Sequence, residues 1–515
     1  MHRVIAPASQ RERVALGGAP LTLEDLTRIA AGARVSLAPD VPARVAPSRV
    51  LIERVLKQGD TVYGVNTGFG ELQSIRIQAH DVEALQFNLI RSHAAGSGPE
   101  LEPRVTRLML ALRAHSLALG YSGVRLTLLE HLVKMLETNI LPVVPSRGSL
   151  GASGDLIPLA HLALAAIGEG EVRVEGSVAN AADLLRGNGI APLTLQAKEG
   201  LALINGTQAM TAVGALALIE GAEVLRAAHV ACALSADAAR ASTKPFEPRV
   251  HAIRPHAGQR DSAAALARLL EGSGIVASHE GCGKVQDPYS IRCAPQVLGS
   301  SVTAFRQTRE TVLTEANSVS DNPLCFADTG EVISAGNFHG EPVAQALDFL
   351  AIGMAEVGSI AERRTFLLLD SARSGLPAFL SPDAGLQSGL MIVQYLQAAL
   401  VSENRMLAQP SSVDSLPTSA GQEDHVSMGM HAALKALALT RNVRRIVAAE
   451  MLCAAQGIHL LRPLRSSEPL ERALKGLREI VPPLSADRRQ DQDLERLDEW
   501  IASGAAAEAA GVGAF

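Results

Sequence analysis

The sequence predicts a mainly α-helical protein with a mixed N-terminal domain over residues 1–206 and a long up-and-down helical bundle over 207–515. Aromatic residues make up only 3% of the chain, while Ala and Leu are abundant, and this composition favours helix over sheet. Long stretches after residue 206 repeat apolar residues at helical intervals. With 515 residues the chain is long enough for two domains, each with its own core.

In the first domain, Thr22 and Asp25 have the spacing of a capping box, which predicts the start of a helix. Apolar residues at helical spacing predict further helices over 104–119 and 125–137. Residues 171–179 alternate between apolar and polar side chains, which predicts a short hairpin.

The bundle is expected from longer patterns. Apolar residues recur at intervals of three and four over 343–361, and similar patterns cover 387–407 and 428–456. The stretch 209–236 is long and apolar, but three charged residues interrupt it, so we expect a buried bundle helix rather than a membrane span. Helices this apolar would leave large exposed patches on a monomer, which favours an oligomer.

Charge and cysteine content exclude several classes of function. The net charge is −6 and no basic patch stands out, so we expect a small-molecule substrate and neither a nucleic acid nor a membrane as partner. His and Cys residues do not cluster at ligand spacings, so no metal is expected. Residues 1–13 lack the apolar core of a signal peptide, and the odd number of cysteines fits a reducing cytoplasm better than a disulfide framework. The five cysteines are Cys232, Cys282, Cys293, Cys325 and Cys453.

The most informative segment is 148–154, Gly-Ser-Leu-Gly-Ala-Ser-Gly, whose core is Ala152-Ser153-Gly154. In such a tripeptide the Gly nitrogen can attack the Ala carbonyl carbon, and loss of two waters gives 4-methylidene-imidazol-5-one, an electrophilic alkene. Gly has no Cβ to block the tight backbone, and Ser supplies the hydroxyl that leaves. A Gly/Ser-rich run is more often a plain loop, but the apolar helix expected at 156–164, with Asp155 near its start, would direct positive charge at the ring.

Six motifs follow one another along the chain, at 62–70, 148–161, 203–207, 285–293, 320–323 and 336–340. In this order they resemble the aromatic amino-acid lyases that use methylidene-imidazolone, a family of histidine, phenylalanine and tyrosine ammonia-lyases and related aminomutases. The resemblance covers residues from about 50 to 460 and implies the fold of that family. It also implies a homotetramer in which several subunits build each active site, with no metal or diffusible cofactor.

The resemblance implies catalytic roles for residues around the ring formed by Ala152, Ser153 and Gly154. Tyr63 is expected to remove the β-proton of the substrate, which requires local positive charge or hydrogen bonds to favour its phenolate. Asn205 and Tyr289 are expected to stabilise the ring and its enolate-like oxygen by hydrogen bonds.

The resemblance also implies three substrate-binding residues. Arg292 should hold the substrate carboxylate in a two-pronged pair, the geometry for which a guanidinium is suited. Gln286 should orient the carboxylate or the ring, and Phe338 should pack against the substrate's imidazole.

Two segments favour histidine as substrate, and hence loss of ammonia from L-histidine to give trans-urocanate. Residues 88–96, with His93, and 422–428, with Glu423, resemble the histidine-specific members. Polar partners suit an imidazole, whereas a phenyl ring would prefer apolar neighbours. Glu423 is read either as a clamp for the imidazole or as a proton carrier, and the clamp is favoured. Gly421 departs from the Asn expected at its place.

Three alternatives stay open. The first is a tyrosine or phenylalanine ammonia-lyase, the second an aminomutase, and the third a non-catalytic helical scaffold. Within the histidine hypothesis, either the substrate's amine or its ring could attack the alkene, and the sequence does not separate these two mechanisms.

Overall fold

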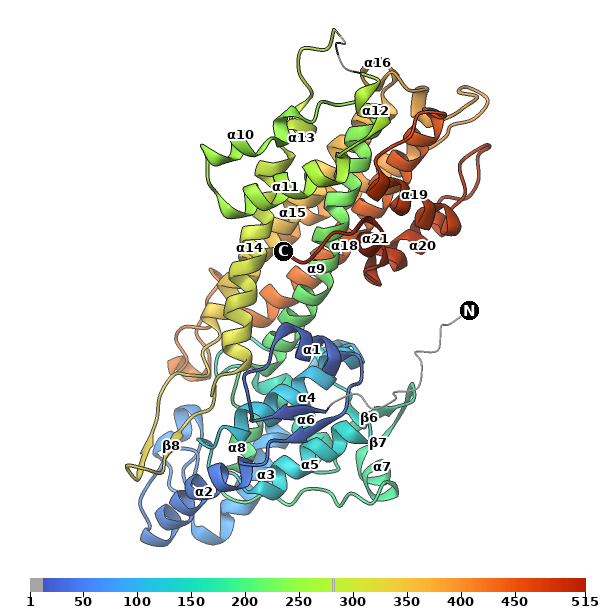
Figure 1. Cartoon of the computed structure of the whole chain (residues 1–515). Helices are drawn as coiled ribbons and strands as arrows, with labels where there is room; N and C mark the ends of the chain where they lie inside the picture. The colour runs from blue at the N-terminus through green and yellow to red at the C-terminus, as the bar shows by residue number, and fades with distance from the viewer. Residues whose placement is uncertain (1–12, 280, 282) are drawn as a thin grey trace. The chain divides into compact units, whose positions relative to one another are not determined.

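The computed structural model describes residues 13–279, 281 and 283–515, so Cys282 and the first twelve residues lie outside it. Two compact units make up the chain (Figure 1). The first continues to Leu216, beyond the boundary expected at residue 206, and also contains Arg309–Leu347 and Pro410–Leu434. The second consists of Ala217–Thr308, Asp348–Gln409 and Lys435–Phe515. The described cysteines are free thiols.

The first unit begins with a helix whose capping box is confirmed, since Thr22 Oγ1 accepts a hydrogen bond from the Asp25 N–H and the Asp25 side chain accepts one from the Thr22 N–H. The helices predicted over 104–119 and 125–137 are also confirmed, as α4 and α5. The helices of this part are α1 (Leu23–Ala30), α2 (Val41–Gln58), α3 (Val82–His93), α4 (Pro103–Ala118), α5 (Leu126–Glu137), α6 (Leu156–Ala166), α7 (Ala181–Gly187) and α8 (Glu199–Ile204).

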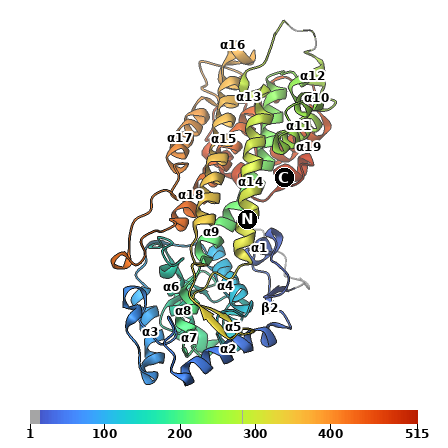
Figure 2. The ribbon, with the colours of Figure 1, turned by 90° about the vertical axis from the view of Figure 1, so that its left-hand side faces the viewer.

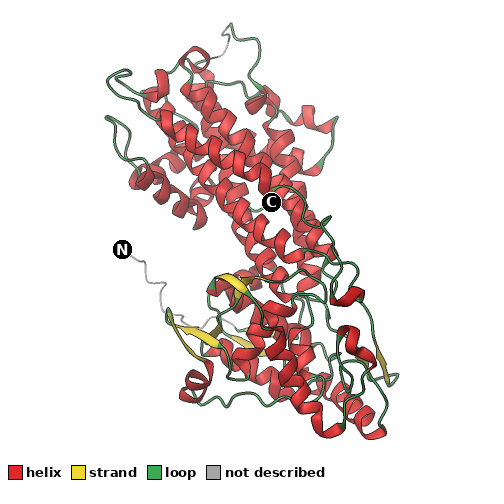
Figure 3. Ribbon diagram, turned by 180° about the vertical axis from the view of Figure 1, so that it is seen from behind, coloured by secondary structure: helices red, strands yellow, loops and turns green. Residues whose placement is uncertain are grey.

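Short strands lie among these helices (Figure 3). The hairpin predicted at 171–179 is confirmed as an antiparallel pair, β6 with β7, and β4 joins the outer side of β6. The remaining strands pair in twos, β1 with β2, β3 with β5 and β8 with β9. Their bounds are β1 (Val14–Leu16), β2 (Val35–Leu37), β3 (Ser97–Glu100), β4 (Leu141–Pro142), β5 (Pro145–Arg147), β6 (Glu171–Val174), β7 (Ser177–Asn180), β8 (Leu324–Phe326) and β9 (Glu331–Ile333).

All four long helical patterns of the predicted bundle are helices in the structure (Figure 2). The 31 residues of α9 correspond to a length of about 46 Å. Both α9 and α15 are long and apolar enough to cross a membrane, but 78% of the most apolar window of α9 is buried, as in the core helix of a bundle. These helices are α9 (Gln208–Ala238), α15 (Glu341–Leu369), α17 (Met391–Leu407) and α18 (Gly429–Leu460).

Within the second unit a buried ion pair joins three of these helices. Arg364 of α15 donates to both carboxylate oxygens of Glu450 on α18, at 2.5 and 2.8 Å, and both side chains are fully buried. Ser235 of α9 donates to the same carboxylate at 2.7 Å. The other helices are α10 (Pro248–Ala252), α11 (Ala257–Leu270), α12 (Gly274–Ala277), α13 (Tyr289–Arg292), α14 (Ala294–Ala316), α16 (Ser371–Ser374), α19 (Glu468–Ile480), α20 (Asp491–Ala502) and α21 (Ala505–Ala510).

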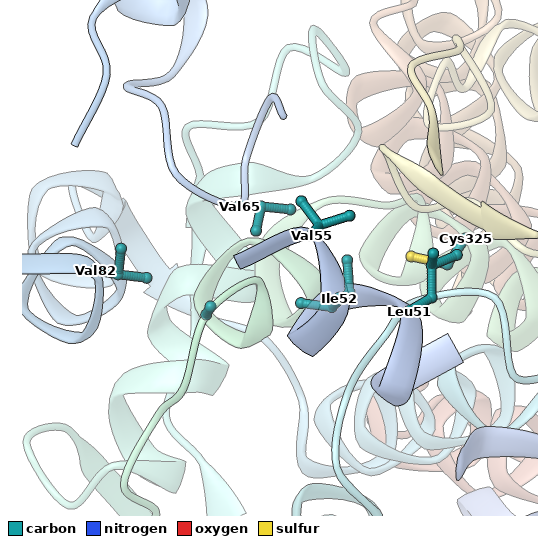
Figure 4. Packing of buried hydrophobic residues seen from close by; sticks show 7 residues of the cluster. Leu51, Ile52, Val55, Val65, Val82 and Cys325 are labelled. Carbon is teal, nitrogen blue, oxygen red and sulfur yellow. The ribbon is translucent and has the colours of Figure 1, made fainter. Parts of the chain in front are cut away.

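An apolar cluster in the first unit anchors the loop that carries Tyr63 (Figure 4). Val65 of this loop is fully buried against side chains of α2. The side chain of Asn66 fixes the backbone of the loop, because it accepts a hydrogen bond from the Val62 N–H at 2.9 Å and donates one to the Asp60 carbonyl at 2.7 Å. The loop is therefore fixed on both sides of Tyr63. The buried members of the cluster are Leu51, Ile52, Val55, Val65, Val82, Ala197 and Cys325.

Candidate active site

The ring-forming tripeptide lies in a tight turn that only glycine fits. Gly154 has φ +72°, and a Cβ built on it would lie 2.2 Å from the carbonyl oxygen of Gly206. The Asp155 N–H donates to that same oxygen at 2.7 Å, so the turn is pressed against the segment that follows α8. A nitrogen without a neighbouring Cβ, held in a compact turn, is what the cyclisation of Ala152-Ser153-Gly154 requires. These residues therefore fit the prosthetic ring expected from the sequence.

Asp155 fixes the far side of this turn. Its buried carboxylate accepts hydrogen bonds from the Ser149 hydroxyl and from the Met210 N–H, both at 2.7 Å. Burial raises its pKa to about 6, even though these hydrogen bonds act in the opposite direction. The helix expected after Asp155 is confirmed as α6, but the Asp155 side chain satisfies a free N–H in the first turn of α9 rather than one of α6.

Asn205 contacts the atom that the ring would retain. Its Nδ2 donates to the carbonyl oxygen of Ser153 at 3.2 Å. Cyclisation removes the oxygen of Ala152 and the hydroxyl of Ser153, so the Ser153 carbonyl oxygen would become the oxygen of the ring. The Asn205 Oδ1 is buried and has no hydrogen-bond partner among the described residues. Asn205 thus presents a donor to the ring oxygen and a free acceptor beside it.

Glu423 lies on the hydroxyl side of Ser153. Its Oε1 accepts a hydrogen bond from Ser153 Oγ at 2.8 Å, and its Oε2 accepts one from Thr418 Oγ1 at 2.8 Å. The backbones of Thr418 and Glu423 also pair, which closes the loop that carries the carboxylate. Thr418 therefore orients Glu423 toward Ser153, a role that its sequence context did not reveal.

The surroundings of Tyr63 disfavour the phenolate. Burial raises the pKa of Tyr63 above its usual value, a hydrogen bond from the Gly70 backbone lowers it, and the negative charge of Glu423 raises it further. The sequence argument expected local positive charge to favour the phenolate. Among the described residues around Tyr63, burial and the Glu423 carboxylate raise the pKa more than the hydrogen bond lowers it.

His93 is held in one tautomer at the end of α3. Its Nδ1 lies 2.8 Å from the Leu89 carbonyl oxygen, which can only accept, so Nδ1 carries the hydrogen. Burial lowers the pKa of His93, although the Leu89 carbonyl and the charge of Glu423 act to raise it. The neutral ring then has its acceptor lone pair on Nε2.

Two adjoining cavities in the first unit bring these side chains together. Their volumes are about 330 and 570 Å³, within the range of small-molecule sites. Phe338 and Ala152 line the smaller cavity, and His93 lines the larger one. The residues that line both are Tyr63, Gly70, Ser153, Asn205 and Glu423.

Gln286, Tyr289 and Arg292 belong to the second unit. Gln286 and Arg292 line a cavity of about 770 Å³ there, and Tyr289 is 70% exposed. Arg292 Nε donates to the Asp287 carbonyl at 3.0 Å, and the guanidinium lies over the Tyr289 ring, 4.5 Å from its centroid. With Nε engaged, the two Nη groups are the pair suited to a carboxylate. The predicted site residues of one chain therefore fall into two groups, one in each unit.

One departure from the expected motifs has a simple structural reason. Gly421 has φ +90°, and nothing lies within 4 Å of the position its Cβ would take. Gly adopts this left-handed conformation readily and Asn does so more easily than other residues, which makes either acceptable.

Comparisons with known proteins identify the family of this chain. Residues 21–479 match the family described as aromatic amino acid lyase. A histidine ammonia-lyase of Symbiobacterium thermophilum is 51% identical over 488 residues, which cover 95% of this chain and 96% of the relative. The crystal structure of histidine ammonia-lyase from Trypanosoma cruzi has a TM-score of 0.90 at 43% identity, covering 97% of this chain and 95% of the other. A tyrosine aminomutase from Streptomyces globisporus has a TM-score of 0.92 at 37% identity, covering 97% and 98%. The protein belongs to the aromatic amino acid lyase family, and its mainly helical fold is the fold of that family.

Proposed function

We propose that the protein is a histidine ammonia-lyase, a carbon-nitrogen lyase that converts L-histidine to trans-urocanate and ammonia in histidine degradation. Relatives about half identical over nearly the whole chain carry that name. The observation that carries the proposal is that Ser153 forms hydrogen bonds with both Asn205 and Glu423, and that all three residues line the same two cavities. A cytoplasmic location accords with this role.

The prosthetic group of the proposed enzyme is 4-methylidene-imidazol-5-one, formed autocatalytically from Ala152-Ser153-Gly154, and it supplies an electrophilic alkene that activates the substrate for loss of ammonia. Asn205 and the backbone of Gly206 hold this segment, through the Ser153 carbonyl and the Asp155 N–H. Tyr63 takes the β-proton of the substrate on its phenol oxygen, and its pKa then requires a cation or a further donor beyond those around it here.

Recognition of the substrate's imidazole rests on three side chains. His93 Nε2 and the Glu423 carboxylate are both acceptors available to the N–H of the ring, and Phe338 covers a face of the ring. Glu423 acts as the clamp for the imidazole. Its position beside Ser153 also makes it available to carry a proton.

The carboxylate of the substrate is held by the Nη groups of Arg292, with Gln286 orienting it and Tyr289 donating a hydrogen bond toward the ring. We assign these three residues to a site completed by other subunits of a homotetramer. The support is a set of exposed apolar side chains on α15 and α17, which a monomer would leave in water. They are Phe349, Ile352, Phe366, Ile392, Tyr395, Leu396 and Met406, each at least 40% exposed.

Incubation of the purified protein with L-histidine, L-tyrosine and L-phenylalanine tests the proposal, because each acrylate product has its own near-ultraviolet absorbance. We expect urocanate from histidine and little product from the other two. The similarity to a tyrosine aminomutase makes β-amino acid formation the second candidate, and chromatography of the products detects it. A tryptic peptide spanning 148–161 should have a mass two waters below that of its sequence. Product from tyrosine alone would overturn the assignment.

A further inference from the structure

Arg113 is a fully buried cation in the first unit, on the α4 helix. Its Nη1 donates to the backbone carbonyl of Asn205 at 2.9 Å and to Gln208 Oε1 at 2.7 Å. Its Nε and Nη2 have no hydrogen-bond partner among the residues that the structure describes. The charge of Asp321 acts on it, but that carboxylate pairs with Lys198 Nζ at 2.7 Å.

A buried charge without its own counter-ion is unfavourable for folding, which calls for a reason in function. Burial lowers the pKa of Arg113 to about 10, so the guanidinium still carries its charge near neutral pH. Its two hydrogen-bond acceptors are both neutral groups.

The place of this charge supplies the reason. The turn at Asn205 and Gly206 is enclosed between Arg113 on one side and the ring-forming segment on the other. A Cβ on Gly206 would lie 2.4 Å from Arg113 Nη1, and the Gly206 carbonyl accepts from the Asp155 N–H at 2.7 Å. Asn205 connects Arg113 to the ring-forming segment. Its backbone carbonyl accepts a hydrogen bond from Arg113, and its Nδ2 donates one to the Ser153 carbonyl oxygen.

We infer that Arg113 is a positioning residue for the electrophile: it fixes the Asn205 amide on the Ser153 oxygen and places a full positive charge behind it. That oxygen is the atom of the proposed ring on which negative charge would collect when a nucleophile adds to the alkene. A cation held in a medium of low dielectric supports such charge more strongly than a helix terminus on its own. The inference rests on the proposed function, because it requires the ring to form.

Arg107 offers a matched control on the same helix. It is also buried, and its guanidinium donates to the carbonyls of Ile29, Ala33 and Leu136, which do not line either cavity of the site. Arg107 also donates to Asn139 Oδ1, so Arg107→Gln removes a buried charge and twice as many hydrogen bonds as Arg113→Gln, without touching Asn205.

The test uses addition of cyanide to the alkene, in which the cyanide carbon bonds to Cβ of Ser153 and water supplies the proton. The rate of cyanide addition measures the reactivity of the alkene directly, with no substrate bound. Mass spectrometry of the peptide spanning 148–161 gives the fraction of chains that contain the ring, and rates are expressed per ring. We expect Arg113→Gln to contain less ring and to add cyanide about tenfold more slowly. Arg113→Lys, which keeps the charge, should recover most of the rate, and Arg107→Gln should add cyanide at the unsubstituted rate.

An Asn205→Ala background shows whether Arg113 acts through Asn205. We expect Arg113→Gln to slow cyanide addition less there than in the unsubstituted protein, because only the charge of Arg113 can still act. An equal loss in both backgrounds, or no loss in either, would overturn the inference. If Arg113→Gln does not fold, a second neutral variant, Arg113→Met, is compared in the two backgrounds by the same criterion. A peptide with its full mass in the unsubstituted protein would overturn the proposed function itself, whereas a ring formed normally and insensitive to Arg113 would overturn this inference alone.

Discussion

The hydroxyl of Ser153 and the carboxylate of Glu423 form a 2.8 Å hydrogen bond, although 270 residues separate them in the chain. In the proposed enzyme this hydroxyl leaves and its carbon becomes the reactive end of the alkene. The carboxylate that we propose as the partner of the substrate's imidazole would therefore stand beside the carbon that the substrate must reach. This contact would place recognition of the ring and activation of the substrate at one point.

Replacement of Ser153 by Ala should leave the fold intact and abolish the chemistry. No hydroxyl can leave, so no alkene forms, and turnover of histidine should fall by at least about a thousandfold. The mass of the peptide spanning 148–161 should show no loss of water. Circular dichroism and thermal unfolding serve as the check on folding, and full turnover by this variant would refute the electrophile.

The double variant His93→Leu, Glu423→Gln should lose histidine turnover and gain preference for apolar aromatic rings. It removes the acceptor at His93 Nε2 and the charge of Glu423, which leaves the N–H of the substrate's imidazole without a strong partner. Relative kcat/KM for histidine and phenylalanine should shift by about a hundredfold or more in favour of phenylalanine. His80→Leu, at an exposed histidine, is the control. Unchanged histidine turnover in the double variant would mean that these residues do not bind the ring.

Arg292→Lys should weaken binding of the substrate carboxylate by roughly 10- to 100-fold in KM, since an ammonium cannot form the two-pronged pair. The measurement that isolates this role compares inhibition by imidazole propionate, which has a carboxylate, with inhibition by histamine, which lacks one. Only the former should weaken. Arg249→Lys replaces an arginine whose side chain is 84% exposed and should leave the inhibition constants of both compounds unchanged. Equal weakening of both inhibitors would argue against the carboxylate role.

Tyr63 should ionise above pH 10 in the protein without substrate. Burial and the Glu423 charge raise its pKa, so less than about one part in a thousand is phenolate at neutral pH. The chain has four tyrosines, and the difference in ultraviolet absorbance between the protein and Tyr63→Phe isolates this one during a pH titration. Tyr63→Phe should also lower kcat by about a hundredfold or more. Ionisation below pH 9 would show that a cation outside the described surroundings governs the phenol.

Local patterns in the sequence predicted α1, α4, α5, α6 and the four long bundle helices, because each of these patterns depends only on nearby residues. The periodicity of 343–361 indicates a helix within α15 whatever the helix packs against, and the alternation over 171–179 suffices for a hairpin. The boundary of the first unit does not follow from such patterns, since Arg309–Leu347 and Pro410–Leu434 return to it through long-range contacts.

The candidate site also combines features that local sequence patterns indicate with features that depend on long-range contacts. The motif around Ser153 indicated the chemistry, but its neighbours come from distant segments and were named through family resemblance. Spacing along the chain placed Asp155 at the start of α6, whereas tertiary contacts direct its carboxylate to α9. Arg113 carries no local signal, because it acts on Asn205, which is 92 residues away. Thr418 lies five residues from Glu423, but the importance of that contact depends on Ser153, which is 270 residues from Glu423.

The close approach of Gly154 to Gly206 also has a consequence for the history of each molecule. The compact turn exists only when segments distant in sequence have already come together, so an unfolded chain has no means of closing the ring. In the proposed enzyme the covalent loss of two waters would therefore persist after unfolding and would show that the chain had once folded. Chains that were never native and chains that were later denatured would remain distinguishable on a mass spectrometer, even when both are fully unravelled.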